Sequence, residues 1–131
     1  KEEKHFKSNG KILFMDDEDS IRSIAELFFQ KLNYKVALTK NGDEALALYK
    51  DQYENGSPFD YVFLDLNIPK GMNGFDCAHE ILKINPDAKI IAVSGNFILS
   101  EYKEHGFIKA MKKPFRIANI QTVFKELADK K

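Results

Sequence analysis

Five polar residues whose side chains could handle a metal ion and a phosphoryl group stand at or just after the ends of short apolar runs. They are Asp16, Asp17, Asp65, Ser94 and Lys113. Three carboxylates that meet in one place repel each other unless a cation lies among them. Oxygen ligands with open coordination positions suit Mg²⁺, with Mn²⁺ as the alternative, and these ions bind phosphate oxygens. An ammonium and a hydroxyl group could then share the charge of a transferring phosphoryl group, with one carboxylate as the nucleophile.

The elements that must position these residues alternate along the chain. Buried strands are predicted at residues 12–15, 36–38, 61–64, 89–93 and 107–111. Helices are predicted at 19–32, around 45–49, at 75–84 and at 117–127, and a polar segment with some helical character leads to Gly106. This alternation predicts an α/β fold, a flavodoxin-like (βα)5 three-layer sandwich with helices on both faces of a parallel sheet. In the strand order 2-1-3-4-5 the first and third strands are neighbours where the order reverses, so Asp16, Asp17 and Asp65 would converge.

Composition limits the classes of function. The 131 residues, 44% of them hydrophobic, suit a single domain, with a core at about 11–127 and loose ends at 1–10 and 128–131. A formal net charge of zero provides no global field that would attract nucleic acid or an anionic membrane. The one cysteine excludes an internal disulfide, and no apolar stretch approaches the ~20 residues that span a bilayer. We therefore expect a cytoplasmic domain without membrane contact, and the initial Lys1 favours a domain cut from a longer protein.

The sequence resembles a response-regulator receiver domain over nearly its whole length, from about Lys11 to Leu127. The matching motifs, in chain order, are Phe14-Met15-Asp16-Asp17-Glu18, Leu64-Asp65-Leu66-Asn67-Ile68-Pro69, Gly74, Val93-Ser94-Gly95 and Lys113-Pro114-Phe115. Each motif is weak alone, but five in order at the expected strand ends make a specific signal.

The resemblance implies a metal-dependent phosphoacceptor. Asp65 would take the phosphoryl group from a phosphohistidine, and the domain would promote its own phosphorylation and dephosphorylation. Asp17 and Asp65 would ligate Mg²⁺ directly, Asp16 would act mainly through water, and the backbone carbonyl of Asn67 would complete the protein ligands.

The same resemblance assigns roles around the phosphoryl group. Ser94 would move its hydroxyl toward that group, and Lys113 would pair with its oxygens. The peptide bond from Lys113 to Pro114 is expected to be cis. Asn67 and Asn96 flank the expected site, and their side chains are interpreted as modulators.

Two departures from the family pattern concern the output of the domain. Ala110 stands three residues before the lysine, where the family usually has a switching Phe or Tyr. The loop at residues 69–74 is one residue longer than the common form, which resembles receivers at the carboxyl end of hybrid sensor histidine kinases. We therefore expect a relay module, and its partner would be a histidine kinase dimerisation domain or a histidine phosphotransfer protein. The partner would dock on the loop after Lys113 and on the first helix around Ile21, Ile24, Ala25 and Phe28.

Other interpretations remain beside this one. A stand-alone response regulator is an alternative, and Ala110 keeps open a pseudo-receiver that binds proteins without taking phosphate. A flavodoxin-like cofactor module is rejected, because Asp17-Glu18-Asp19 places negative charge where a flavin phosphate would bind. A phosphatase with an aspartyl nucleophile lacks support, since Asn67 stands where a second acid would be needed.

Four residues outside these motifs are expected to be structural or exposed. The three histidines, His5, His79 and His105, are scattered without ligand spacing and are expected at the surface. Cys77, on a predicted helix, is expected to be structural. The oligomeric state is left open by the sequence.

Overall fold

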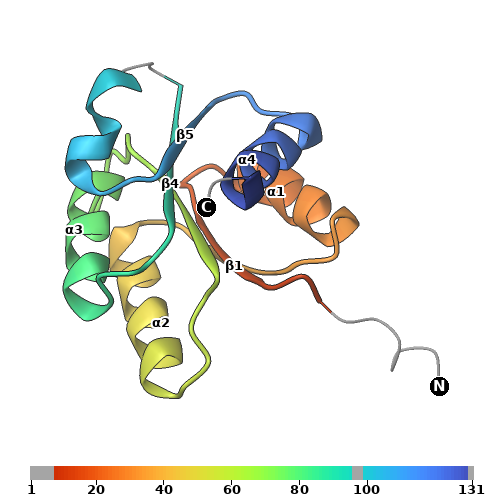
Figure 1. The fold of residues 1–131 in the computed structure, drawn as a ribbon. Helices are drawn as coiled ribbons and strands as arrows, with labels where there is room; N and C mark the ends of the chain where they lie inside the picture. Colours follow the sequence, from red (N-terminus) through yellow and green to blue (C-terminus); the bar gives the residue numbers. More distant parts are fainter. Residues whose placement is uncertain (1–7, 96–98, 130–131) are drawn as a thin grey trace.

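The computed structural model describes residues 8–95 and 99–129 and confirms the predicted parallel sheet (Figure 1). The strands are β1 (Lys11–Met15), β2 (Lys35–Thr39), β3 (Tyr61–Asp65), β4 (Ile90–Ser94) and β5 (Lys109–Lys112). Their order is β2-β1-β3-β4-β5, and every neighbouring pair is parallel. The order reverses between β1 and β3, so the carboxyl ends of these strands form the expected crevice.

Helices cover both faces of the sheet. They are α1 (Asp19–Lys31), α2 (Gly42–Glu54), α3 (Gly74–Ile84) and α4 (Ile117–Asp129). In Figure 1, α1 and α4 lie together on one side of the sheet, and α2 and α3 lie on the other. The α3 helix is therefore on the opposite face from α1, although both begin close to the carboxyl edge.

The connection between β4 and β5 differs from an ideal fifth βα unit. It contains a 3₁₀ helix, η2 (Leu99–His105), where the sequence predicted a polar segment of partly helical character. This 3₁₀ helix is seven residues long and is followed by Gly106, whose φ of 92° redirects the chain into β5. A 3₁₀ run of seven residues is longer than most, because the i→i+3 hydrogen bonds have poorer geometry than those of an α-helix.

The core consists of two layers because side chains alternate along each strand. Leu13 and Met15 of β1 point into the layer beneath α2 and α3. Ile12 and Phe14 point the opposite way, into the layer beneath α1 and α4. This second layer is rich in aromatic contacts, such as that between Phe14 and Phe29 with ring centroids 6.1 Å apart.

The long loop after β3 is attached to the start of α2. The backbone N–H of Gly42 donates to the carbonyl oxygen of Met72 at 2.7 Å, and the N–H of Met72 donates to Oδ2 of Asp43 at 3.0 Å. A Cβ atom on Gly42 would lie 2.6 Å from the same carbonyl oxygen, so only glycine allows this approach. The loop that follows Asp65 is therefore held in place at its far end.

A candidate metal and phosphoryl-transfer site

The three predicted acids meet at the carboxyl edge of the sheet. Asp16 and Asp17 follow β1, Asp65 ends β3, and one oxygen atom from each lies within 4.8 Å of the others. Register explains the meeting, since Met15 is paired with Leu64 in the sheet. Asp16 and Asp65 are fully buried, whereas Asp17 is exposed. The cluster therefore opens to solvent on the side of Asp17.

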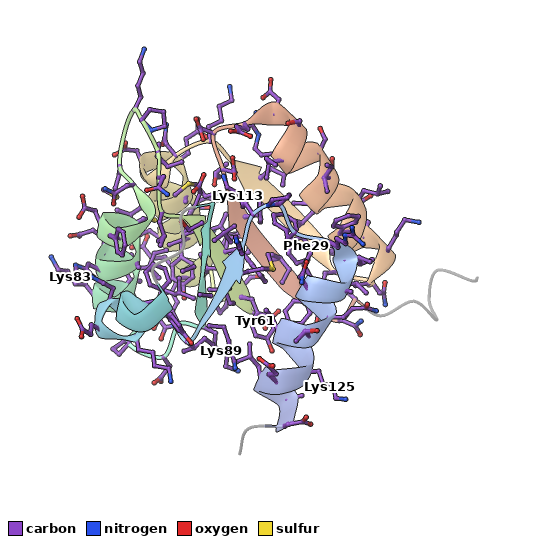
Figure 2. All side chains as sticks on the ribbon, turned by 90° about the horizontal axis from the view of Figure 1, so that it is seen from above. Phe29, Tyr61, Lys83, Lys89, Lys113 and Lys125 are labelled. Carbon is purple, nitrogen blue, oxygen red and sulfur yellow. The ribbon has the colours of Figure 1, made fainter. Side chains whose placement is uncertain are left out.

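Lys113 places its ammonium group between the two buried acids. Its Nζ atom donates to Oδ2 of Asp16 and to Oδ2 of Asp65, both at 3.0 Å. The backbone N–H of Lys113 donates to the carbonyl oxygen of Ser94 at 2.9 Å, which fixes this segment to the end of β4. The peptide bond from Lys113 to Pro114 is cis, as the resemblance implied. Figure 2 labels Lys113 near the ends of the strands.

Ser94 and Asn67 lie beside Asp65 and are joined by a hydrogen bond. The side-chain amide of Asn67 donates to the hydroxyl oxygen of Ser94 at 3.2 Å, and the backbone N–H of Asn67 donates to Oδ1 of Asp65 at 3.1 Å. Ser94 is 8% exposed, and Asn67 is exposed. Asn96, the other expected modulator, lies outside the described residues.

The surroundings of Asp65 shift its proton equilibrium. Burial raises the pKa of Asp65 to about 6, and the nearby charge of Asp16 adds to this effect, while the hydrogen bonds from Lys113 and from the N–H of Asn67 oppose it. Burial would lower the pKa of Lys113, but its bonds to Asp65 and Asp16 raise the pKa above its ordinary value. Lys113 therefore stays charged, and it only partly compensates the negative charge of the acids.

The ligand atoms fit a hard divalent cation. The candidate donors are carboxylate oxygens on a solvent-open edge, without sulfur or imidazole among them. Such oxygen sites suit Mg²⁺, which retains several waters and binds through one or two carboxylates together with phosphate oxygens. The arrangement thus brings three carboxylates, two of them buried, and the ammonium group of Lys113 together at one edge of the sheet.

Gly74 allows α3 to begin directly against the end of β3. A Cβ atom at this position would lie 2.5 Å from the carbonyl oxygen of Asp65. Asn73 caps the helix, because its side-chain oxygen accepts the N–H of Asp76 at 2.9 Å. The Gly74 motif therefore has a steric origin at the site itself.

Arg22 holds the acidic loop in place, a role that the sequence did not predict. Its Nη1 atom donates to the carbonyl oxygen of Asp16 at 2.8 Å, and its Nη2 atom forms an ion pair with Asp19. The guanidinium group thereby joins the first turns of α1 to the acidic loop. A bond to a backbone atom leaves little trace in residue type or spacing, and only the position of Arg22 one turn into the helix could have suggested it.

Ala110 lies on β5, opposite Ala92 of β4, and is partly buried. It packs against the layer beneath α2 and α3, as does Tyr102 of η2. In the described residues, β5 therefore carries only the methyl group of Ala110 at this position, and the aromatic ring of Tyr102 packs against the same core layer.

The family model for the response regulator receiver domain matches residues 12–125. The chain belongs to this family. The receiver domain is 38% identical to the chemotaxis protein CheY of Thermotoga maritima over 85 residues, 64% of this chain and 66% of that protein. It is 30% identical to the sensor kinase CckA of Brucella abortus over 128 residues, 91% of this chain.

A solved structure is similar over nearly all of the receiver domain. The receiver domain of the histidine kinase CKI1 from Arabidopsis thaliana, complexed with Mg²⁺, has a TM-score of 0.80 and 29% identity, covering 93% of this chain and 94% of that chain. The chain spans 9% to 12% of the length of the sensor kinases that it matches. In the part of the chain that the structure describes, no helix has the length and apolar character required to span a bilayer.

Proposed function

We propose that this receiver domain accepts a phosphoryl group on Asp65 from a phosphohistidine, with Mg²⁺ bound beside it. The observation that carries the proposal is the buried carboxylate of Asp65, held at a strand end between Asp16 and the ammonium group of Lys113. One oxygen of Asp65 would form the new bond to phosphorus while the bond from phosphorus to the histidine nitrogen breaks. The histidine leaves as a neutral imidazole after taking up a proton.

Each neighbouring residue has a role that follows from its position. Asp17 and Asp65 would hold Mg²⁺ through their carboxylates, together with the carbonyl of Asn67, and Asp16 would act through water. The bound cation would neutralise charge on the phosphoryl oxygens. Lys113 already lies 3.0 Å from Asp65 and would pair with one of those oxygens. Ser94 would turn its hydroxyl from Asn67 toward the same group. Mn²⁺ is a second candidate ion on ligand chemistry alone.

The setting that we propose is the carboxyl-terminal module of a hybrid sensor histidine kinase, in the cytoplasm, with residues 1–131 as a single receiver domain. Two observations support it: the similarity to part of CckA, a sensor kinase, and the extended loop at residues 69–74. A stand-alone regulator remains the alternative, favoured by the similarity to CheY. A pseudo-receiver is disfavoured by the intact acids and Lys113.

The docking surface for a helical histidine domain would be α1. Ile24 and Leu27 are 42% and 51% exposed, so α1 presents two large apolar side chains to solvent. Ala25, which the sequence assigned to the docking face, is wrong for that role because it is fully buried. Ile24 and Leu27 lie three residues apart, so their side chains are neighbours on α1, the helix that begins just after Asp16 and Asp17.

The test is phosphorylation with a small-molecule donor. The chain is incubated with Mg²⁺ and acetyl phosphate, and intact mass and peptide mapping identify the modified residue. Wild type should gain one phosphoryl group on Asp65, Asp65→Asn should gain none, and Asp87→Asn, an exposed acid elsewhere, should behave as wild type. A wild-type chain that gains no mass would establish the pseudo-receiver instead.

A second measurement separates docking from chemistry. Leu27→Glu should slow transfer from a phosphorylated histidine phosphotransfer protein by at least about fivefold, the equivalent of about 1 kcal/mol in the barrier. The same variant should react with acetyl phosphate at the wild-type rate. Equal transfer rates for both proteins would exclude α1 as the docking surface.

A further inference from the structure

Two histidines form a pair on the surface, on the face of the sheet opposite α1. His79 of α3 and His105 at the end of η2 bring Nε2 and Nδ1 within 3.3 Å of each other. Their ring planes differ by 21°, with centroids 5.3 Å apart. The expectation that these histidines are scattered is therefore wrong, because the fold joins positions 26 residues apart. Figure 1 shows η2, in cyan, beside α3.

Neighbouring aromatic rings hold this pair in position. The ring of Phe75 meets that of His105 edge to face, with centroids 4.6 Å apart, and also contacts Phe107 at 6.1 Å. Phe75 and His79 are four residues apart and so lie on the same side of α3. His105 is partly buried, whereas His79 is exposed. One ring is thus fixed by packing, and solvent reaches the pair from the other.

We propose that His79 and His105 form a binding site for a first-row transition metal ion, with Zn²⁺ as the probe ion. Imidazole nitrogens bind zinc at about 2.0–2.1 Å, and a tetrahedral angle then separates two such nitrogens by about 3.3–3.4 Å. The observed 3.3 Å matches that separation. The rings lie nearly edge to edge, so each must turn for both lone pairs to meet on one ion, and the broad χ2 torsion of histidine permits this turn.

This site is distinct in chemistry from the acidic cluster around Asp65. Imidazole nitrogens favour zinc, copper and nickel, whereas carboxylate oxygens favour magnesium. No cluster of three or more ligating side chains among the described residues includes His79 or His105. Water would therefore occupy the remaining positions, as the exposure of His79 allows. A bound ion would fasten η2 to α3 and so restrain the connection between β4 and β5.

Zinc titration of the whole chain tests the proposal. Isothermal titration is carried out with Mg²⁺ in large excess, so that the acidic cluster is occupied. Wild type should bind one zinc ion per chain at this site. His79→Gln and His105→Gln should each weaken this binding by at least about tenfold, the loss expected from about 1.4 kcal/mol of binding energy. His5→Gln, the third histidine, is the matched control and should bind as wild type does.

Long-range ¹H–¹⁵N spectra of the imidazole rings provide a second measurement that does not depend on affinity. Zinc should shift the ring nitrogens of His79 and His105 together and leave those of His5 unchanged. Unchanged ring signals, or zinc binding unaffected by both glutamine variants, would show that the pair is only a hydrogen bond between α3 and η2. One zinc ion shared by two chains would equally overturn a site within a single chain.

Discussion

The side-chain amide of Asn67 donates a hydrogen bond to the hydroxyl oxygen of Ser94 at 3.2 Å, directly beside the carboxylate of Asp65. This bond holds the hydroxyl group that we expect to turn toward a phosphoryl group. Asn67→Ala should therefore remove one bond that restrains the Ser94 hydroxyl and speed phosphorylation by acetyl phosphate by about fivefold, the equivalent of one hydrogen bond of about 1 kcal/mol. The metal should still bind, because the proposed ligand of Asn67 is its backbone carbonyl.

A double-mutant cycle checks that the effect of Asn67 passes through Ser94. Ser94→Ala alone should slow phosphorylation, since the hydroxyl donor is lost. In that background Asn67→Ala should change the rate little. A fivefold acceleration that persists without the hydroxyl would show that Asn67 acts on the phosphoryl group by another route.

Magnesium should stabilise the folded domain. Cations that bind only the folded chain add about 2.7 kcal/mol to its unfolding free energy at a concentration one hundred times Kd. Asp17→Asn removes the exposed carboxylate of the cluster and should abolish most of the rise in Tm. Glu18→Gln, a neighbouring exposed acid, should retain it. Melting curves with and without millimolar Mg²⁺ decide the matter, and a wild-type Tm indifferent to Mg²⁺ would contradict the site.

The raised pKa of Asp65 predicts a pH dependence for the metal-free chain. Its folded-state pKa of about 6 exceeds the ~3.9 of an unfolded aspartate, so protonation favours folding. That contribution is complete below about pH 4 and is lost as the pH rises through 6. Asp65→Asn removes the charge and should raise the Tm at pH 7.5 by about 3–5 °C, or about 1 kcal/mol.

The same measurement contains its own controls. The gain from Asp65→Asn should shrink at pH 4.5, where the wild-type carboxyl group is already protonated in the folded chain. Added Mg²⁺ should favour wild type, because the variant has lost a ligand. A Tm difference between Asp65→Asn and wild type that does not vary between pH 4.5 and 7.5 would mean that the ionised carboxylate of Asp65 does not destabilise the folded chain.

Ala110 predicts a small conformational response to phosphorylation. A methyl group has no alternative rotamers, so it cannot fill space that the hydroxyl of Ser94 vacates. With beryllofluoride and Mg²⁺, amide shifts should stay within the loops after β1, β3, β4 and β5, as a relay requires. Large shifts through η2 and β5 would contradict this, and would direct attention to Tyr102, which packs in the same layer as Ala110. Tyr102→Leu would then test whether that ring performs the switching task.

The apolar runs and the acids that end them were sufficient to predict parallel βα units and a ligand edge. The strand order was taken from the flavodoxin-like fold, and the observed order confirms it together with the meeting of the acids. Lys113 was placed at the same edge, but its position between Asp16 and Asp65 depends on side-chain directions that spacing does not specify. Arg22 was missed because it binds a backbone oxygen. Ala25 was misassigned because helical periodicity does not show which apolar residues turn inward when both helix faces carry them.

The contact between His79 and His105 could not be predicted either, because the two residues are far apart in the sequence. His79 and His105 have no spacing that suggests contact, and only the packing of η2 on α3 joins them. The 3₁₀ character of η2 likewise went beyond the sequence, which indicated only a polar segment with some helical character before Gly106.

The ammonium group of Lys113 bears on whether the chain folds before or after it binds a divalent ion. Because it already lies 3.0 Å from both buried carboxylates, the carboxyl edge is partly neutralised before any divalent ion arrives. We therefore expect folding not to require the metal, so that a newly synthesised chain reaches its native form where free Mg²⁺ is scarce. A longer protein that carries this domain could complete its own assembly first and acquire the competence to receive a signal afterwards.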